Sequence, residues 1–448
     1  MKKRTLILLL IAINVWAQQK PKESYRFSLD QAIAHALEHN YTAINSQRDI
    51  DKAQKRKWET TASGLPQING GIDYTYNIEI PLNPIPARFF DPEAPEDEFA
   101  AVPFSPKQSV NARLTLSQLL FDGSYIVALQ ASKTYLQFYR NAKAKTDNEV
   151  REMVINAYGN VLLTEESIAI LERNQTILDK TLHDTRETFK NGLIEEENVE
   201  QLEITQASIL SSLNNAKRLK DISYNMLKVA LGIDIEDELV LTDKLDALAQ
   251  SNMAAAFMRD SFNIENNIDY QIGKNFTEQR NLEWKLEKSK ALPTLSANYN
   301  FGYNAFDAEF RFLNSDQKYY NYQSVGVSLN IPIFSSGLRS ARSQQAKIAY
   351  EQSKTQLTET EQRLKLQYAQ AKSEYEFSIE ELSTKKNSLR LAERIEGKQQ
   401  IKFTEGLSSS FDFSEAQRQL YTAQQDYLQA MVNVINRKAS LEKITNGK

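Results

Sequence analysis

The sequence predicts an α+β membrane protein in which one repeat of helix, strand, strand, long helix and helix occurs twice. Three observations lead to this fold class. Short segments recur about 214 residues apart, four segments alternate apolar and polar residues as membrane strands do, and two proline-free segments of 69 residues have a helical pattern. Together they predict a β-sheet joined to long coiled-coil helices.

The duplication is carried by matched sequence markers. Residues 189–193 read Phe-Lys-Asn-Gly-Leu, and residues 403–407 read Phe-Thr-Glu-Gly-Leu. Residues 120–123, Leu-Phe-Asp-Gly, recur at 333–337 as Ile-Phe-Ser-Ser-Gly, and the spacing between the two markers agrees in both copies to within one residue. A period of this length predicts one doubled architecture in place of two or three ordinary domains.

A secretory signal is expected at residues 1–17. A basic start is followed by an apolar run over residues 5–15 and then by Ala17, after which we expect cleavage. This run is too short to span a bilayer as a helix. Cleavage removes three positive charges, so the formal net charge changes from −4 to −7. The chain has no cysteine, which excludes disulfides, thiolate metal sites and lipid attachment at an N-terminal cysteine.

The mature chain divides into a first repeat at 18–232, an equatorial linker at 233–259 and a second repeat at 260–448. Each repeat is expected to hold two strands, the loop between them and one long helix. In the first repeat these are strands at about 67–80 and 109–119, a loop at 81–107 and a helix at 122–190. In the second they are strands at about 294–304 and 324–333, a loop at 305–323 and a helix at 337–405.

Each strand segment has one apolar and one polar face. The apolar residues of the first segment all fall on even positions, at Ile68, Ile72, Tyr74, Tyr76, Ile78 and Ile80. This alternation matches the wall of a membrane β-barrel, and a soluble β-meander with its core on one face is the alternative. Four strands cannot close a barrel, and an open edge in lipid leaves backbone groups unpaired. A membrane location therefore requires two, three or four copies.

The long helices are expected to form coiled coils, because apolar residues such as Val154 and Val161 recur at seven-residue steps. Each would be roughly 100 Å long at the rise of an α-helix. Shorter helices are expected at 29–61, 193–231, 260–291 and 411–445. The two short helices of each repeat together match the length of one long helix, so they could stack end to end beside it.

The order and spacing of several short segments resemble one known family over nearly all of the mature chain. These segments are residues 28–32, 36–40, 65–67, 117–123, 292–293 and 332–337, and the turn at Gly406. The family is that of the TolC-like outer-membrane efflux proteins. The resemblance implies a homotrimer with a twelve-stranded barrel in the outer membrane, continuous with a long α-helical barrel through the periplasm. It further implies a passive export duct that docks to a periplasmic adaptor and an inner-membrane pump.

The resemblance also implies site residues at the periplasmic end. Members of the family close that end with acidic rings, and the matching positions hold Asp412 and Glu415. Three copies would place six carboxylates around a narrow axis, where they would crowd one another and attract cations. A cap on the last helix is the alternative for Asp412. The family's tyrosine and arginine latch positions hold Phe403 and Ser408, so the latch is not expected here.

Two tight turns are the expected adaptor-docking sites. Glycine at their centre also suits a plain helix C-cap, where positive φ is required, and both roles can hold together. The turns consist of Asn191, Gly192, Leu193, Glu405, Gly406 and Leu407.

Two other classes of protein compete with the export duct. His35, Glu38 and His39 match the His-x-x-Glu-His pattern of some zinc peptidases, with both histidines on one helical face. The only other histidine is His183 and no separate catalytic domain is apparent, so we expect neither an enzyme nor a bound metal or cofactor. A periplasmic coiled-coil scaffold or adaptor is the second alternative, but the paired, tyrosine-rich strands do not suit it. The acidic balance argues against nucleic acid as a partner.

Overall fold

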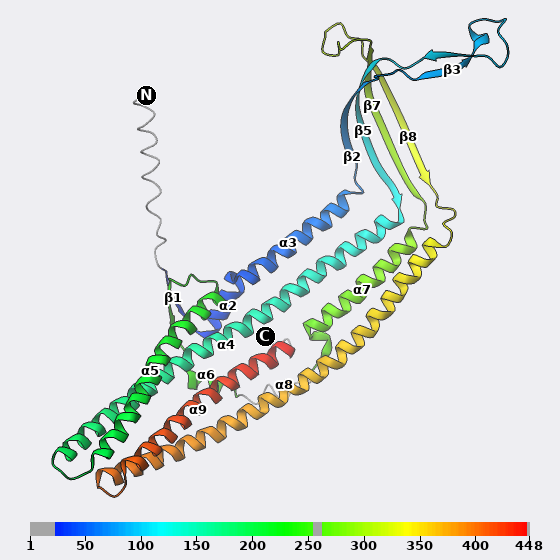
Figure 1. Cartoon of the computed structure of the whole chain (residues 1–448). Helices are drawn as coiled ribbons and strands as arrows, with labels where there is room; N and C mark the ends of the chain where they lie inside the picture. Colours follow the sequence, from blue (N-terminus) through cyan, green and yellow to red (C-terminus); the bar gives the residue numbers. More distant parts are fainter. Residues whose placement is uncertain (1–22, 254–261, 446–448) are drawn as a thin grey trace, which may run out of the picture. The chain divides into compact units, whose positions relative to one another are not determined.

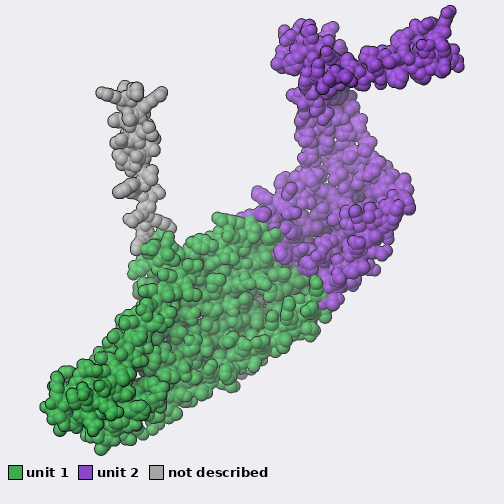
Figure 2. All heavy atoms as spheres, in the orientation of Figure 1, with its two compact units in different colours: residues 1–50, 139–274, 356–448 green, residues 51–138, 275–355 purple. Residues whose placement is uncertain are grey.

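The computed structural model describes residues 23–253 and 262–445 (Figure 1). The signal expected at 1–17 therefore lies outside the described residues. The chain divides into two compact units, which Figure 2 colours separately. The helical unit takes its residues from 1–50, 139–274 and 356–448, and the sheet unit takes 51–138 and 275–355. Each unit draws on both sequence repeats, so the repeats are not separate domains.

The sheet unit contains a four-stranded antiparallel sheet in the order β2-β5-β7-β8. The strands are β2 (Gln67–Tyr76), β5 (Gln108–Asp122), β7 (Thr294–Asp307) and β8 (Tyr320–Asn330). The two repeats meet where β5 pairs with β7, and the register shifts there between Leu119 and Phe121. Strands β2 and β8 form the two edges of the sheet.

The two faces of the sheet differ in polarity, as the alternation predicts. Ile72 on β2 is 77% exposed and Val325 on β8 is 78% exposed, although both are apolar. The opposite face carries polar cross-strand pairs, such as Thr115 donating to Asn300 at 2.9 Å. A soluble meander would bury its apolar face against a core. The exposed apolar face therefore disfavours the soluble alternative.

The predicted loop 81–107 is not structureless: it contains a hairpin. Strands β3 (Leu82–Pro86) and β4 (Phe99–Pro103) pair antiparallel, and Figure 1 shows them extending away from the four-stranded sheet. Arg88 fastens the tip, since its Nη1 lies 2.6 Å from Glu96 and its Nε donates to the Ala94 carbonyl at 2.9 Å. The prolines argued for a loop, but proline is tolerated in edge strands, and both strands of a two-stranded hairpin are edges.

Four long helices form two hairpins. They are α4 (Gly123–Lys190), α5 (Glu196–Leu231), α8 (Leu338–Thr404) and α9 (Ser410–Thr445). Helix α4 follows β5 without a loop, because the Asp122 carboxylate accepts the backbone N–H of Ser124 at 2.7 Å and caps the helix. In the helical unit, Val154 and Val161 of the heptad pattern are fully buried and belong to one hydrophobic cluster. A second hydrophobic cluster, nearer the turns, includes Leu171, Leu178 and Leu182.

The helix expected at 29–61 is two helices, α2 (Leu29–His39) and α3 (Tyr41–Ala62). The break is at Asn40, which is extended and 5% exposed. Its Oδ1 accepts the N–H of Thr42 at 2.8 Å, while its Nδ2 donates to the Ala230 carbonyl of α5 at 2.8 Å. The helix breaks here because the buried Asn40 caps the start of α3 and also donates a hydrogen bond to a backbone carbonyl at the end of α5.

The second repeat has the same hydrogen-bonding arrangement at Asn267. The helix expected at 260–291 is α7 (Ile268–Ser289), and Asn267 precedes it. The Asn267 Oδ1 accepts the N–H of Asp269 at 2.9 Å, and its Nδ2 donates to the Ile444 carbonyl of α9 at 2.7 Å. Ala230 and Ile444 are separated by the period of the sequence repeat, so the duplication is visible in the hydrogen bonding.

The equatorial linker has its own secondary structure. Strand β6 (Glu238–Leu241) pairs in parallel with β1 (Ser24–Phe27), and α6 (Leu245–Ser251) follows. The buried Tyr158 hydroxyl of α4 contacts the Asp243 carboxylate at 3.0 Å and donates to the Phe27 carbonyl at 3.1 Å. These bonds fasten the linker and the N-terminal strand to α4.

Within the described part of the chain, no helix combines the length and the apolar character needed to cross a membrane.

Candidate functional site at the helical turns

The two turns between the long helices have the same backbone geometry. Gly192 and Gly406 have φ of 72° and 70°, the left-handed region that side chains disfavour. In each, the leucine that follows donates its N–H five residues back, Leu193 to Thr188 and Leu407 to Lys402. This is the Schellman arrangement of a helix C-cap. Leu193 is 75% exposed and Leu407 is 77% exposed, so both turns present an apolar side chain to solvent.

Asp412 has a structural role at the start of α9. Its Oδ2 accepts from the Ser409 hydroxyl at 2.7 Å, and its own N–H donates to the same hydroxyl at 3.1 Å. Ser409 is therefore the N-cap, and Asp412 is the third residue of a capping box. Asp412 therefore takes part in capping α9, which was the alternative role for it, although the N-cap residue itself is Ser409.

Glu415 is held by side chains of its own helix. Its carboxylate accepts from Arg418 at 2.5 and 2.9 Å and from Gln419 at 3.0 Å. The hydrogen bonds from Arg418 and Gln419 hold the pKa of Glu415 below its usual range. Glu415 is thus ionised but locally balanced by the guanidinium. The sequence reasoning missed Arg418, although its position three residues after Glu415 is the spacing at which helical side chains meet.

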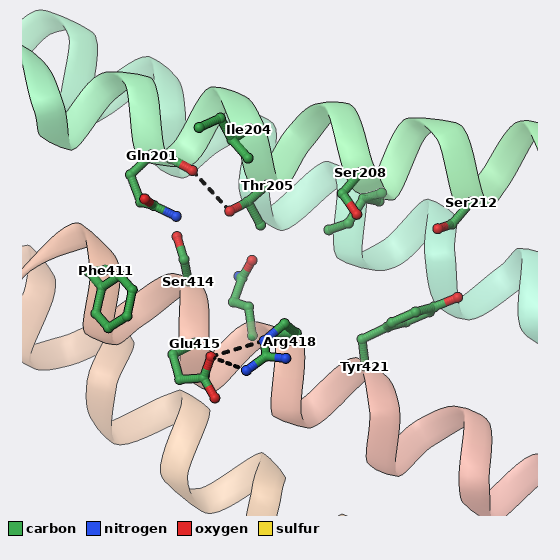
Figure 3. Close-up of a pocket in the computed structure, with 12 residues that line it drawn as sticks. Gln201, Ile204, Thr205, Ser208, Ser212, Phe411, Ser414, Glu415, Arg418 and Tyr421 are labelled. Carbon is green, nitrogen blue, oxygen red and sulfur yellow. Dashed lines mark hydrogen bonds and ion pairs between the residues drawn. The ribbon is translucent and has the colours of Figure 1, made fainter.

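A groove of about 420 Å³ lies between α5 and α9 beside Glu415 (Figure 3). It combines hydroxyl and amide groups with the aromatic rings of Phe411 and Tyr421. Ser414 and Gln417 line the groove and are buried, and among the described residues neither the Ser414 Oγ nor the Gln417 Oε1 has a hydrogen-bond partner. The two hairpins meet close by, because the Asn198 side chain accepts the N–H of Ser410 at 3.3 Å.

The two positions at which the family has its tyrosine and arginine latch hold Phe403 and Ser408 in this chain. Phe403 stacks on the fully buried Phe413, with ring centroids 5.4 Å apart and an interplanar angle of 6°. Phenylalanine has no hydroxyl, so this position cannot form the hydrogen bond of a tyrosine latch. Ser408 has its Oγ buried, with no partner among the described residues.

The two histidines of the zinc-peptidase alternative do lie together. Their rings stack with centroids 4.1 Å apart at an interplanar angle of 6°. Over the described ranges, however, no group of three or more histidine, cysteine or acidic residues could hold a metal ion. The arrangement therefore lacks the third protein ligand of a catalytic zinc site.

Comparison with known proteins identifies this fold. Among solved structures, CusC superposes with a TM-score of 0.73 at 16% identity, covering 97% of this chain and 96% of that one. The CmeC outer membrane channel of Campylobacter jejuni gives 0.71 at 16% identity over 96% and 90% of the chains. The outer membrane protein VceC of Vibrio cholerae gives 0.69 at 15% identity over 94% and 96%. The chain therefore has the fold of these outer membrane proteins.

Sequence comparison gives the family. The outer membrane efflux protein family matches residues 277–447. The outer membrane protein TolC of Vibrio cholerae serotype O1 is 22% identical over 250 residues, and the alignment spans 55% of this chain and 56% of that relative. The predicted resemblance is therefore found by sequence comparison in the second half of the chain, and the solved channels confirm the predicted protomer fold.

Proposed function

We propose that the chain is the outer-membrane export duct of a tripartite efflux or type I secretion system, working as a passive channel. The observation that carries the proposal is the open four-stranded sheet with its exposed apolar face. In lipid, the free edges of β2 and β8 would leave backbone groups unpaired at several kcal/mol each. A sheet of this kind is complete only when other copies cover both edges.

Three copies satisfy this requirement. All neighbouring strands in the sheet are antiparallel, so β8 runs opposite to β2. Placing β8 of one copy beside β2 of the next therefore continues the alternation. Three copies give a twelve-stranded barrel, within the range of even-numbered outer-membrane barrels. The homotrimer implied by the family resemblance agrees with this count.

The two turns between the long helices are the basis for the proposed partners. The exposed Leu193 and Leu407 occupy equivalent positions on two rigid C-caps, which suits contact with a periplasmic adaptor linked to an inner-membrane pump. Asp412 and Glu415 stay in the proposal as a gate ring. Because Arg418 balances Glu415, the net negative charge of that ring is smaller than six free carboxylates would give.

The experiment that tests the proposal combines mass and conductance. The protein is extracted in detergent, its mass is measured by light scattering, and the same sample is added to planar bilayers. A trimer with a small, cation-favouring conductance supports the export duct. A detergent-free soluble monomer without conductance would contradict it and favour the periplasmic scaffold or adaptor.

A further inference from the structure

The helices of the sheet unit are more basic than the chain as a whole. The parts of the helices that belong to this unit are residues 51–62 of α3, 123–138 of α4, 275–289 of α7 and 338–355 of α8 (Figure 2). Together they contain twelve basic and six acidic residues, whereas the whole chain contains 54 and 58. An acidic chain therefore has its excess of positive charge in the helices that adjoin the sheet.

A groove of about 350 Å³ lies between α3, α4 and α7 in this basic part of the unit. One part of its lining is apolar and comes from α4 and α7. The apolar residues are Val127, Ala128, Ala131, Leu282 and Leu286. Arg56 and Lys57 of α3 line the same groove, so it combines two cations with an apolar surface.

The chain itself does not neutralise these two cations. Among the described residues that line the groove, Glu283 alone is acidic, and its carboxylate is paired with Arg280 at 2.7 Å. The Arg56 guanidinium lies over the Tyr135 ring, 5.4 Å from its centroid, and within the described ranges neither Arg56 nor Lys57 forms an ion pair. The charge and the apolar surface together are complementary to an amphipathic anion.

The groove lies close to the ends of three strands of the sheet. Thr60 is seven residues before β2, Val127 is five residues after β5, and Leu286 is eight residues before β7. At the rise of an α-helix, Val127 is about 6 Å along α4 from its first residue. The headgroup layer on each side of a bilayer is about 5–8 Å thick. With the sheet in the membrane, the groove is therefore within reach of lipid headgroups.

We propose that this groove binds an anionic phospholipid from the leaflet on the helical side of the sheet, an inference that rests on the membrane location in the proposed function. The lipid phosphate pairs with Arg56 and Lys57, and an acyl chain lies along the apolar residues of α4 and α7. Basic residues next to membrane segments attract anionic lipids, and basic pockets between helices bind their headgroups. Burial of the acyl chain adds a favourable apolar contribution.

The experiment measures lipid bound to the full mature chain purified in detergent. The probe is phosphatidylglycerol, compared with phosphatidylcholine of the same acyl chains, and native mass spectrometry measures the bound lipid. Arg56→Gln/Lys57→Gln removes both cations. Lys52→Gln/Lys55→Gln is the matched control, because these are exposed lysines of the same helix that do not line the groove. Ala131→Phe fills the apolar part of the groove without changing its charge.

The wild type is expected to bind phosphatidylglycerol more tightly than phosphatidylcholine. Arg56→Gln/Lys57→Gln should weaken phosphatidylglycerol binding at least about tenfold and remove the preference, since two cations near the headgroup are lost. Lys52→Gln/Lys55→Gln should leave affinity and preference unchanged. Ala131→Phe should weaken the binding of both lipids, because it occupies the space of the acyl chain.

Two results would overturn the proposal. One is equal phosphatidylglycerol affinity in the wild type, Arg56→Gln/Lys57→Gln and Ala131→Phe. The other is binding that inorganic phosphate displaces and that Ala131→Phe does not change, since the groove would then be an anion site without a lipid chain.

Mass and conductance are measured on the same samples. A conducting trimer without these lipid effects overturns the lipid site alone. A soluble monomer without conductance overturns the export duct, and with it the membrane position on which the lipid site depends.

Discussion

At the scale of single residues, the charge at the proposed gate depends on a pairing within one helix. Glu415 is partly exposed, and the hydrogen bonds from Arg418 and Gln419 hold its pKa below the ordinary value for glutamate. A group whose pKa is depressed keeps its charge above that pKa and loses it as the pH falls through it. Replacing Arg418 should therefore raise the pKa of Glu415 and also remove a positive charge from the proposed ring.

We expect Arg418→Ala to strengthen block by divalent cations at neutral pH, because Glu415 is then unbalanced. As the pH is lowered, the contribution of Glu415 to block should be lost at a higher pH than in the wild type. Bilayer conductance in the presence of a divalent cation measures both effects. Arg437→Ala is the matched control, since Arg437 lies on α9 like Arg418 but pairs with Glu374 of α8. Unchanged block in both Arg418→Ala and Asp412→Ala/Glu415→Ala channels would contradict the gate ring.

Substitution of the two turn leucines tests adaptor docking without disturbing the fold. Leu193→Asp and Leu407→Asp change side chains that are largely exposed, so their cost in stability should be within about 0.5 kcal/mol. We expect the double variant to lose export in cells while it still assembles in the outer membrane. Export assays and membrane fractionation measure these two properties.

The control for the turns is Gly192→Asn, because asparagine tolerates positive φ and no atom lies within 4 Å of the added Cβ. This variant should still export. Normal export by Leu193→Asp/Leu407→Asp would show that the turns are C-caps without a docking role.

At the scale of elements, two buried asparagines decide where helices begin and end. Asn40→Ala and Asn267→Ala each leave a carbonyl of another helix without its donor, and each removes an N-cap. We expect each to lower the free energy of unfolding by about 1–3 kcal/mol, measured by denaturant titration in detergent. Asn45→Ala, at an exposed position of α3, should change it by less than about 0.5 kcal/mol. Equal effects at all three positions would contradict the capping role.

The hairpin β3–β4 shows why local patterns misjudge some elements. Its strands contain three prolines, and its paired residues are 13 to 21 positions apart in the chain. The alternation that identified the four sheet strands is absent there. Cross-strand pairing and the Arg88–Glu96 ion pair hold the hairpin, and neither is visible as a periodic pattern.

At the scale of the whole molecule, the proposal requires β2 of one copy to lie beside β8 of the next. The absence of cysteine lets a pair of introduced thiols report this contact. We expect chains carrying Asn69→Cys with Ser324→Cys or Ser328→Cys to form covalent dimers and trimers on a non-reducing gel. These positions are on the polar face of the two edge strands.

The matched control is Thr115→Cys/Asn300→Cys, because these side chains are bonded within one sheet. This pair should cross-link inside a chain without increasing its mass. Monomers from every edge pair, with the control pair cross-linked, would contradict closure of the sheet by copies.

The sequence by itself determined the duplication, the two-faced strands, the long helices and the glycine turns. The duplication is visible because matched segments recur, and the other three features depend on residues within a turn or two of one another, where periodicity and capping act. The tertiary structure decided the rest: the break at Asn40, the pairing of β5 with β7, and the groove between α3, α4 and α7. Each requires a partner from a distant part of the chain. The role of a buried polar group or ring depends on the residues that pack against it. Those residues are distant in sequence, so a local sequence pattern does not predict them.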